Sequence, residues 1–217
     1  MKRTWIAIAL LAALPVAAQQ DYSKVEVKTQ KLTNTTYMLT GAGGNIGVCV
    51  GDDAVFVVDD QFAPMAPKIQ AAIAAISPKP VTFILNTHWH GDHTGGNVTF
   101  GQSGAVILAH DNVRQRLSAA ELEQKAKEKP GAKPGAGLPV VTFAQDVTLH
   151  LNGDTVHVFH VPPAHTDGDV VVHFTKANVI HTGDLFLSRG YPFVDLGSGG
   201  SFEGFIRNRQ AVVFLIG

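Results

Sequence analysis

The chain has 217 residues, of which 45% are hydrophobic and 16% are charged. This apolar content is enough for one large domain or two small ones, and it excludes an intrinsically disordered chain. The formal net charge is −1, so there is no basic excess to neutralise phosphates, and a nucleic-acid partner is not expected. Cys49 is the only cysteine and forms no internal disulfide.

The first eighteen residues have the pattern of a bacterial export signal. Two basic residues precede an apolar run from Trp5 to Leu14, which is too short to span a bilayer in the usual way. Val16–Ala18 has the small side chains of a cleavage site. We therefore expect residues 1–18 to be a signal peptide, residues 19–217 to form one domain, and the protein to be periplasmic or secreted. An uncleaved membrane anchor is the alternative.

The rest of the chain predicts one continuous domain with strands and helices mixed along it. Unbroken apolar runs such as residues 81–85 are typical of strands buried on both faces. Proline residues bracket a helix at 66–76, and Asp111 is expected to cap a helix at 111–128. The Pro/Gly-rich stretch 129–137 is expected to be a mobile loop. The expected strands cover residues 24–27, 36–39, 45–50, 55–58, 81–85, 105–109, 147–151, 155–159, 170–174 and 179–181.

Four potential metal ligands lie within six residues, directly after the apolar run 81–85. They are His88, His90, Asp92 and His93 in the sequence His-Trp-His-Gly-Asp-His. Imidazole nitrogens and carboxylate oxygens are ligands that zinc takes. On an extended stretch His88 and His90 point the same way and suit one ion, while Asp92 and His93 follow a glycine bend and suit a second. A polar surface loop with chance histidines is the alternative.

Two later positions extend this set. His165 lies in a turn after an expected strand, and Asp184 follows the next buried strand in the sequence His-Thr-Gly-Asp. Side chains at strand ends along one edge of a sheet are well placed to meet a ligand. Each position alone is weak evidence, because Asp after Gly is common in turns, but together with the first motif they predict a metal site.

The pattern His-x-His-x-Asp-His, followed by His165 and Gly183-Asp184, resembles the metallo-β-lactamase superfamily over roughly residues 33–205. The resemblance implies an α+β protein with an αββα sandwich, in which two mixed sheets pack face to face with helices outside and a zinc site lies at one rim. It also implies that Asp59 supports the metal loop through hydrogen bonds, although an ordinary turn aspartate is an equal alternative.

The family pattern assigns the ligands to two zinc sites. His88, His90 and His165 would bind the first ion, Asp92 and His93 would bind the second, and Asp184 would bridge both. The best-known metallo-β-lactamases have a cysteine at the position of Asp184, and Cys49 is too far upstream to replace it. A carboxylate at this position is more like glyoxalase II, lactonases and sulfatases.

The family has a further zinc histidine in a Gly-His-Gly-like motif after the bridging aspartate. No histidine follows Asp184 in this sequence. We therefore expect the C-terminal part of the fold to be missing, with one tight zinc site, an incomplete second site and an exposed sheet edge. Residues 201–216 are expected to form an amphipathic helix that partly covers this edge. Its apolar face would carry Phe202, Phe205, Ile206, Val213 and Ile216.

The resemblance implies a zinc hydrolase that acts on a small molecule. Zinc-bound hydroxide would attack an amide, lactone or thioester carbonyl, and Asp92 would orient the nucleophile and pass a proton to the leaving group. Two alternatives remain open: a non-catalytic or impaired zinc-binding protein, and a redox member of the family with two irons. The six other histidines are expected to be structural or exposed, and Trp89 to be a packing residue. Residues 191–200 either line the substrate pocket or cover the core.

Overall fold

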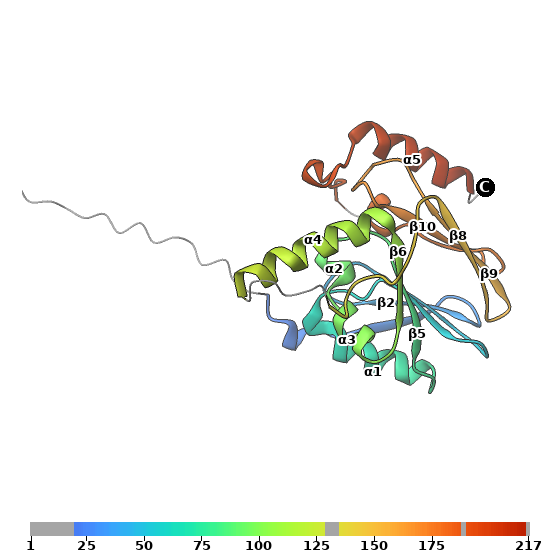
Figure 1. The fold of residues 1–217 in the computed structure, drawn as a ribbon. Coiled ribbons are helices and arrows are strands. Elements are labelled where there is room, and N and C mark those ends of the chain that lie inside the picture. The colour runs from blue at the N-terminus through green and yellow to red at the C-terminus, as the bar shows by residue number, and fades with distance from the viewer. Residues whose placement is uncertain (1–19, 129–134, 188–189, 216–217) are drawn as a thin grey trace, which may run out of the picture.

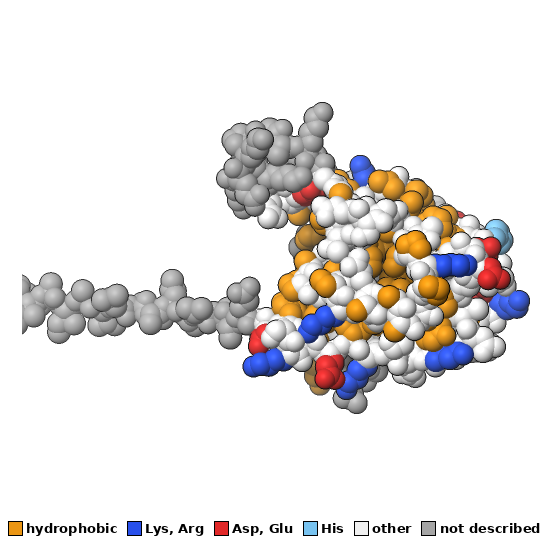
Figure 2. All heavy atoms as spheres, turned by 90° about the horizontal axis from the view of Figure 1, so that it is seen from below, with side chains coloured by type: hydrophobic (Ala, Val, Ile, Leu, Met, Phe, Trp, Pro, Cys, Tyr) orange, Lys and Arg blue, Asp and Glu red, His pale blue; other side chains and the backbone are white. Residues whose placement is uncertain are grey.

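The computed structural model describes residues 20–128, 135–187 and 190–215 (Figure 1). The predicted signal peptide and most of the predicted loop at 129–137 therefore lie outside the described residues. Within these ranges no helix combines the length and the hydropathy needed to cross a membrane. Positive and negative side chains are interspersed on the face that Figure 2 shows, so charge of one sign does not gather there.

A large sheet is formed by the first seven strands, which neighbour one another in chain order. The first four strands pair antiparallel, and the pairings from β4 to β7 are parallel. The strands are β1 (Lys28–Lys31), β2 (Thr36–Thr40), β3 (Ile46–Val50), β4 (Val55–Val58), β5 (Val81–Asn86), β6 (Val106–His110) and β7 (Val141–Phe143).

A second sheet has four antiparallel strands in the order β11-β10-β9-β8. They are β8 (Asp146–Leu151), β9 (Asp154–His160), β10 (Val170–Phe174) and β11 (Val179–His181). The helices are α1 (Ala66–Ile76), α2 (Gly91–Thr94), α3 (Asn97–Gln102), α4 (Asp111–Glu128) and α5 (Phe202–Leu215). Short 3-10 turns occur at Tyr22–Lys24, Ala63–Met65, Gly183–Leu185 and Leu196–Ser198.

The hydrophobic core has layers on both faces of each sheet. In β4 the side chains of Val55 and Val57 pack with α1, whereas Phe56 and Val58 pack against the second sheet. Alternate side chains of β4 thus enter two different core layers. Because both faces of the strand are buried, its sequence is apolar at every position. Behind the second sheet, Phe205 of α5 belongs to a third buried cluster. Figure 1 shows α1 and α5 at opposite sides of the stack. The predicted αββα sandwich is confirmed.

The predicted element boundaries hold closely for most of the chain, and the first strand is the main error. Residues 24–27 are not a strand: a 3-10 turn covers Tyr22–Lys24, and β1 begins at Lys28 with four exposed residues. β1 was missed because its sequence, Lys-Thr-Gln-Lys, has no apolar face. Its position depends on pairing with β2. The sequence also gave no prediction of β7, which has only three residues.

The start of α4 differs from the prediction in one detail. The helix begins at Asp111 itself, and the ring of His110 accepts a hydrogen bond at Nδ1 from the Asn112 N–H at 3.2 Å. An N-cap residue is one whose side chain accepts a hydrogen bond from a free N–H group in the first turn of the helix. His110 therefore has the capping role that was predicted for Asp111.

The predicted C-terminal helix is present as α5, but its predicted apolar face is wrong. Phe205 is buried, whereas Phe202 and Ile206 are 63% and 64% exposed. Asn208 donates to the Pro162 carbonyl at 2.6 Å, and Gly204 packs on the neighbouring Pro163. This close contact turns Phe205 inward and leaves Phe202 and Ile206 facing outward. The side chains of residues 213 and 216 lie outside the described residues.

Candidate metal centre

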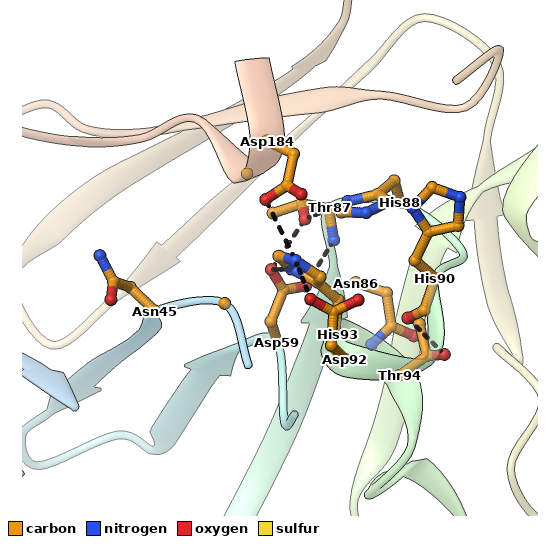
Figure 3. Close-up of polar contacts among 12 residues, drawn as sticks. Asn45, Asp59, Asn86, Thr87, His88, His90, Asp92, His93, Thr94 and Asp184 are labelled. Carbon is orange, nitrogen blue, oxygen red and sulfur yellow. Dashed lines mark hydrogen bonds and ion pairs between the residues drawn. The ribbon is translucent and has the colours of Figure 1, made fainter. Parts of the chain in front are cut away.

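The predicted ligands converge at one edge of the two sheets. His88, His90, Asp92 and His93 lie on the connection after β5, which contains the short helix α2 (Figure 3). From the second sheet, His165 lies between β9 and β10, and Asp184 follows β11. Segments from both layers of the sandwich therefore contribute to one site.

Three histidines form the first cluster of possible metal donors. The Nε2 atom of His165 lies 3.2 Å from Nε2 of His88 and 2.9 Å from Nδ1 of His90. His88 and His165 are each 1% exposed, and the side chain of His90 is 19% exposed. Burial, together with the nearby charges of other histidines, lowers the pKa of His88 well below its usual value, so this ring is neutral.

Hydrogen bonds on the outer side of each ring determine where its proton lies. The Nδ1 atom of His165 is 2.7 Å from the Phe193 carbonyl oxygen, which only accepts, so this nitrogen donates. The Nε2 atom of His90 donates in the same way to the Asp195 carboxylate at 2.9 Å. Each of these two rings therefore turns its other nitrogen inward, where a neutral imidazole carries a lone pair.

His88 follows the same rule through a hydroxyl group. The Thr87 hydroxyl donates to Asp59 Oδ2 at 2.7 Å, and its oxygen is 3.1 Å from His88 Nδ1. Because the hydroxyl proton is already used, the oxygen accepts from Nδ1, and Nε2 of His88 is left with a lone pair. Three lone pairs thus face one point, an arrangement that a cation would stabilise.

A second cluster lies beside the first. His93 Nε2 is 3.1 Å from Asp184 Oδ1 and 3.6 Å from Asp92 Oδ2. The other oxygen of Asp184 is 3.6 Å from His165 Nε2, so this carboxylate stands between the two clusters. Asp92 and Asp184 are partly exposed, with 35% and 26% of their side chains accessible. Solvent and small molecules therefore reach the carboxylate side of this cluster.

Three carboxylates, those of Asp59, Asp92 and Asp184, lie close to the ring of His93. The ring is 1% exposed, and its buried Nε2 atom lies near the Asp184 carboxylate without a well-directed hydrogen bond. Burial opposes its charged form, but Asp59 and Asp184 outweigh burial and raise the pKa of His93 well above its usual value. A strongly raised histidine pKa marks a place of negative potential, where Nε2 is suited to hold either a proton or a metal ion.

Asp59 links the two clusters from outside. Its carboxylate accepts from the Thr87 N–H, from the Thr87 hydroxyl and from His93 Nδ1, each at 2.7 Å. Asp59 has a φ of 64°, an uncommon backbone conformation for a residue with a side chain. This geometry matches the supporting role that the family resemblance implied for Asp59 rather than that of an ordinary turn aspartate.

Two glycines between β2 and β3, Gly43 and Gly44, lie against the second cluster. The stretch lies between two expected strands, and nothing in the local sequence distinguishes its glycines from those of an ordinary turn. A Cβ at Gly44 would overlap the imidazole ring of His93, and one at Gly43 would lie 2.6 Å from the Asp92 carbonyl oxygen. Gln61 holds this loop by donating to the Gly44 carbonyl at 2.6 Å. The glycines therefore let the backbone lie directly against the second cluster.

Replacing Gly44 with alanine is expected to displace the His93 ring and weaken the second metal site. Metal affinity at that site should fall by about 10- to 100-fold, the range seen when the groups around metal ligands are disturbed. The first cluster does not contact Gly44 and should keep its metal. A Zn²⁺ titration followed by calorimetry measures both steps, and equal weakening of both would contradict this assignment. Ser103→Ala, at an exposed position away from both clusters, serves as the control.

Asp195 is a second functional residue that the sequence did not identify. It lies before the 3-10 turn Leu196–Ser198 and accepts there from the Ser198 N–H and hydroxyl. These bonds, with His90 as a further partner, lower the pKa of Asp195 to about 2. The residue therefore stays ionised and fixes the His90 ring. Nothing local marks it in the sequence, because its partner is 105 positions away.

Asp195→Asn is expected to weaken metal binding at the first cluster by about 10- to 100-fold. The amide keeps the shape of the side chain, but it is a poorer acceptor for His90 Nε2–H. Competition with a chromogenic chelator gives the affinity directly, independently of any activity. Asp53→Asn, at an exposed loop, is the control, and an unchanged affinity in the Asp195 variant would rule out this positioning role.

Trp89, the histidines outside the two clusters and the segment 191–200 were also singled out in the sequence. Trp89 is half-buried and packs beside His90, with the Arg116 guanidinium 5.9 Å from its ring centre. His110 stacks on His160 with ring centres 3.8 Å apart, away from the two clusters. The segment 191–200 contributes Phe193 and Asp195 to the support of the first cluster.

Known proteins resemble this chain in both sequence and structure. Residues 39–213 match the family model of the metallo-beta-lactamase superfamily. A hydroxyacylglutathione hydrolase of Pelagibacter ubique is 26% identical over 168 residues, which cover 72% of this chain and 57% of that protein. The chain spans about half the length of the curated relatives it matches.

Solved structures share the fold. A metallo-beta-lactamase from Pontibacter korlensis superposes with a TM-score of 0.65 at 19% identity, over 86% of each chain. A subclass B3 metallo-beta-lactamase of Bradyrhizobium japonicum gives a TM-score of 0.57 at 21% identity, over 70% of this chain and 58% of that one. With the family model matching most of its length, the chain belongs to the metallo-beta-lactamase superfamily.

Proposed function

We propose that this protein is a zinc-dependent hydrolase that cleaves an amide, lactone, ester or thioester bond in a small molecule. The observation that carries the proposal is the orientation of four imidazole rings. In each ring the outer nitrogen is hydrogen-bonded to an oxygen atom. The inner nitrogen faces other atoms that could bind a metal ion. Outer partners that fix ring orientation in this way are characteristic of metal-ligating histidines.

The donor set fits zinc. His88, His90 and His165 would hold the first ion through three neutral nitrogens, which leaves a fourth position open. His93, Asp92 and Asp184 would hold a second ion, with Asp184 also reaching the first. The second set has one nitrogen and relies on two partly exposed carboxylates, so we propose that it binds zinc more weakly. When bound, zinc lowers the pKa of a coordinated water to about 7 and polarises a carbonyl group.

The protein's own residues supply orientation and proton transfer. Asp92 is partly exposed and lies beside both His93 and the glycine loop. From this position its carboxylate would accept a hydrogen bond from the attacking water and orient it. It would then carry the proton to the leaving group. Buried His88 and His165 keep the opposite side of the site closed to solvent.

Two measurements test this function. Elemental analysis of protein loaded with Zn²⁺ and then desalted should give about one zinc per chain. A substrate panel should then include a chromogenic cephalosporin, a lactone and a hydroxyacyl-glutathione thioester. Hydrolysis of at least one class that is lost on chelation and restored by Zn²⁺ supports the proposal. Bound zinc without any turnover would favour a non-catalytic zinc-binding protein, and iron in place of zinc would favour a redox centre.

A further inference from the structure

The first two turns of α4 contact the loop that carries His165. Arg116 binds the Asp167 carboxylate through two hydrogen bonds, from Nε at 2.7 Å and from Nη2 at 2.6 Å. Asn112 lies four positions earlier, on the same face of the helix, and donates to the Asp167 carbonyl at 2.8 Å. The loop is therefore attached to α4 through both the side chain and the backbone of Asp167, two residues after His165.

The same guanidinium group also contacts the other loop of the first cluster. Its central carbon lies 5.9 Å from the ring centre of Trp89, within the range of a cation–π contact. Trp89 stands between His88 and His90 in the chain, and its ring centre is 5.4 Å from that of His90. The indole Nε1 atom is buried, and no acceptor for it is found among the described residues. Packing therefore positions the indole, and Arg116 is part of the packing surface.

A third connection runs from Asp167 to Asp195, the residue that fixes the ring of His90. The Asp167 N–H donates to the Ser198 carbonyl at 3.0 Å, and the N–H and hydroxyl of Ser198 donate to the Asp195 carboxylate. Asp167 and, less strongly, Asp195 raise the pKa of Arg116, so the guanidinium lies in the field of both carboxylates. One cation on α4 is thus connected to the supports of both loops.

An ordinary surface ion pair is the simpler interpretation of Arg116 and Asp167. Exposed pairs of this kind contribute little to stability. In this pair, however, only 28% and 26% of the two side chains are accessible, and the contact has the two-bond geometry of the stronger pairs. Its position separates the two interpretations further, because the contacts of Arg116 end on the two loops that supply His90 and His165.

We propose that Arg116 is a positioning residue of the first metal site. It holds the loops of Trp89 and Asp167 together, so that their histidine nitrogens face one point before any metal ion binds. This inference rests on the proposed zinc site and adds to it a residue that touches neither the metal nor the substrate. Because the loops are already ordered, less of the binding free energy is lost in ordering them, and the affinity for zinc is higher.

The sign of the effect separates positioning from charge. Arg116 is a positive charge near a proposed cation site, so through charge alone its removal would strengthen zinc binding. Positioning predicts the opposite. Arg116→Met keeps an unbranched side chain and should weaken zinc affinity at the first cluster by about tenfold, the lower end of the range for groups around metal ligands. Arg116→Lys keeps the charge but not the two-bond contact, and it should weaken the affinity by about threefold.

Competition for Zn²⁺ with a chromogenic chelator measures this affinity without any assay of activity. Circular dichroism identifies the folded variants, and in folded protein a lower free energy of unfolding does not by itself change the affinity. Arg114→Met is the matched control, because it removes the same charge from the same helix, where Arg114 donates to the Pro139 carbonyl. Its zinc affinity should equal that of the unmodified protein. If Arg116→Met does not fold, Arg116→Lys and Asp167→Asn test the same contact, and both should weaken zinc binding.

Two further readouts complete the test. The visible absorption of protein with about one equivalent of Co²⁺, which accepts the same nitrogen donors, reports the geometry of the site. It should change in Arg116→Met and not in Arg114→Met. The double variant Arg116→Met/Asp167→Ala should lose about tenfold in zinc affinity rather than the product of the two single losses, because each substitution removes the same contact.

Unchanged or tighter zinc binding by folded Arg116→Met would overturn the positioning role, and so would equal weakening in Arg114→Met. Single losses that multiply in the double variant would show that the two residues act separately, which also contradicts the proposal. These results would leave the proposed hydrolase standing. Absence of zinc binding by the unmodified protein would instead contradict the proposed function itself.

Discussion

His88→Ala is expected to abolish hydrolysis and to reduce zinc affinity at the first cluster by more than about 100-fold. Loss of an outer hydrogen bond to a metal ligand commonly costs about 10- to 100-fold in affinity, and loss of the ligand itself should cost more. The ring of His88 is fully buried, so water does not readily replace its nitrogen. Zinc content after desalting and kcat/KM on the best panel substrate are the two measurements.

The control for this variant is His150→Ala, because His150 is exposed on β8 and lies outside both clusters. It should keep its zinc and its activity. Circular dichroism should show that the His88 variant is still folded, so that loss of metal is not a result of unfolding. Retention of tight zinc and of turnover by folded His88→Ala would refute the ligand assignment.

Asp92→Asn is expected to keep the first zinc ion and to lose about 10²- to 10⁴-fold in kcat. This is the usual contribution of a positioned general acid–base group. Asparagine has nearly the same shape, but it neither carries a proton nor accepts as strongly from water. Because three histidines are proposed to hold the first ion, its affinity should change little, whereas the second site should weaken.

Steady-state kinetics at saturating Zn²⁺, together with a zinc titration, separate these two effects. Asp52→Asn, on an exposed turn, removes the same charge at a distance and should leave kcat unchanged. If the Asp92 variant shows the same kcat as this control, Asp92 has no part in proton transfer. If it loses the first zinc as well, its role is to organise the loop.

Local patterns were sufficient for the sandwich and for placing the predicted donors at one edge of it. Apolar runs such as Val55–Val58 identify strands buried on both faces because burial, not pairing, determines their composition. The strands end at one edge, so ligands spread from His88 to Asp184 meet there. β1 was misplaced for the opposite reason: all four of its residues are exposed, and only pairing with β2 defines it.

The support around the metal donors was less visible in the sequence. Gly44 looks like any loop glycine until the ring of His93 is seen against it. Asp195 is one of many aspartates before a short turn, and its contact with His90 depends on how α5 and its preceding segment fold back. Such roles arise from tertiary contact and have no periodicity or local spacing that a single sequence displays.

The two halves of the sandwich meet at the donor atoms. His90 follows a strand of the large sheet and His165 lies between two strands of the small one, 75 positions apart in the chain. An ion held by both would act as a cross-link between the layers. It would stabilise the folded state because it binds the folded chain and not the unfolded one, in a protein whose single cysteine cannot form an internal disulfide. Metal binding would then complete the proposed site and stabilise the fold in the same step. The concentration of free metal around the protein would therefore set the stability of the folded chain.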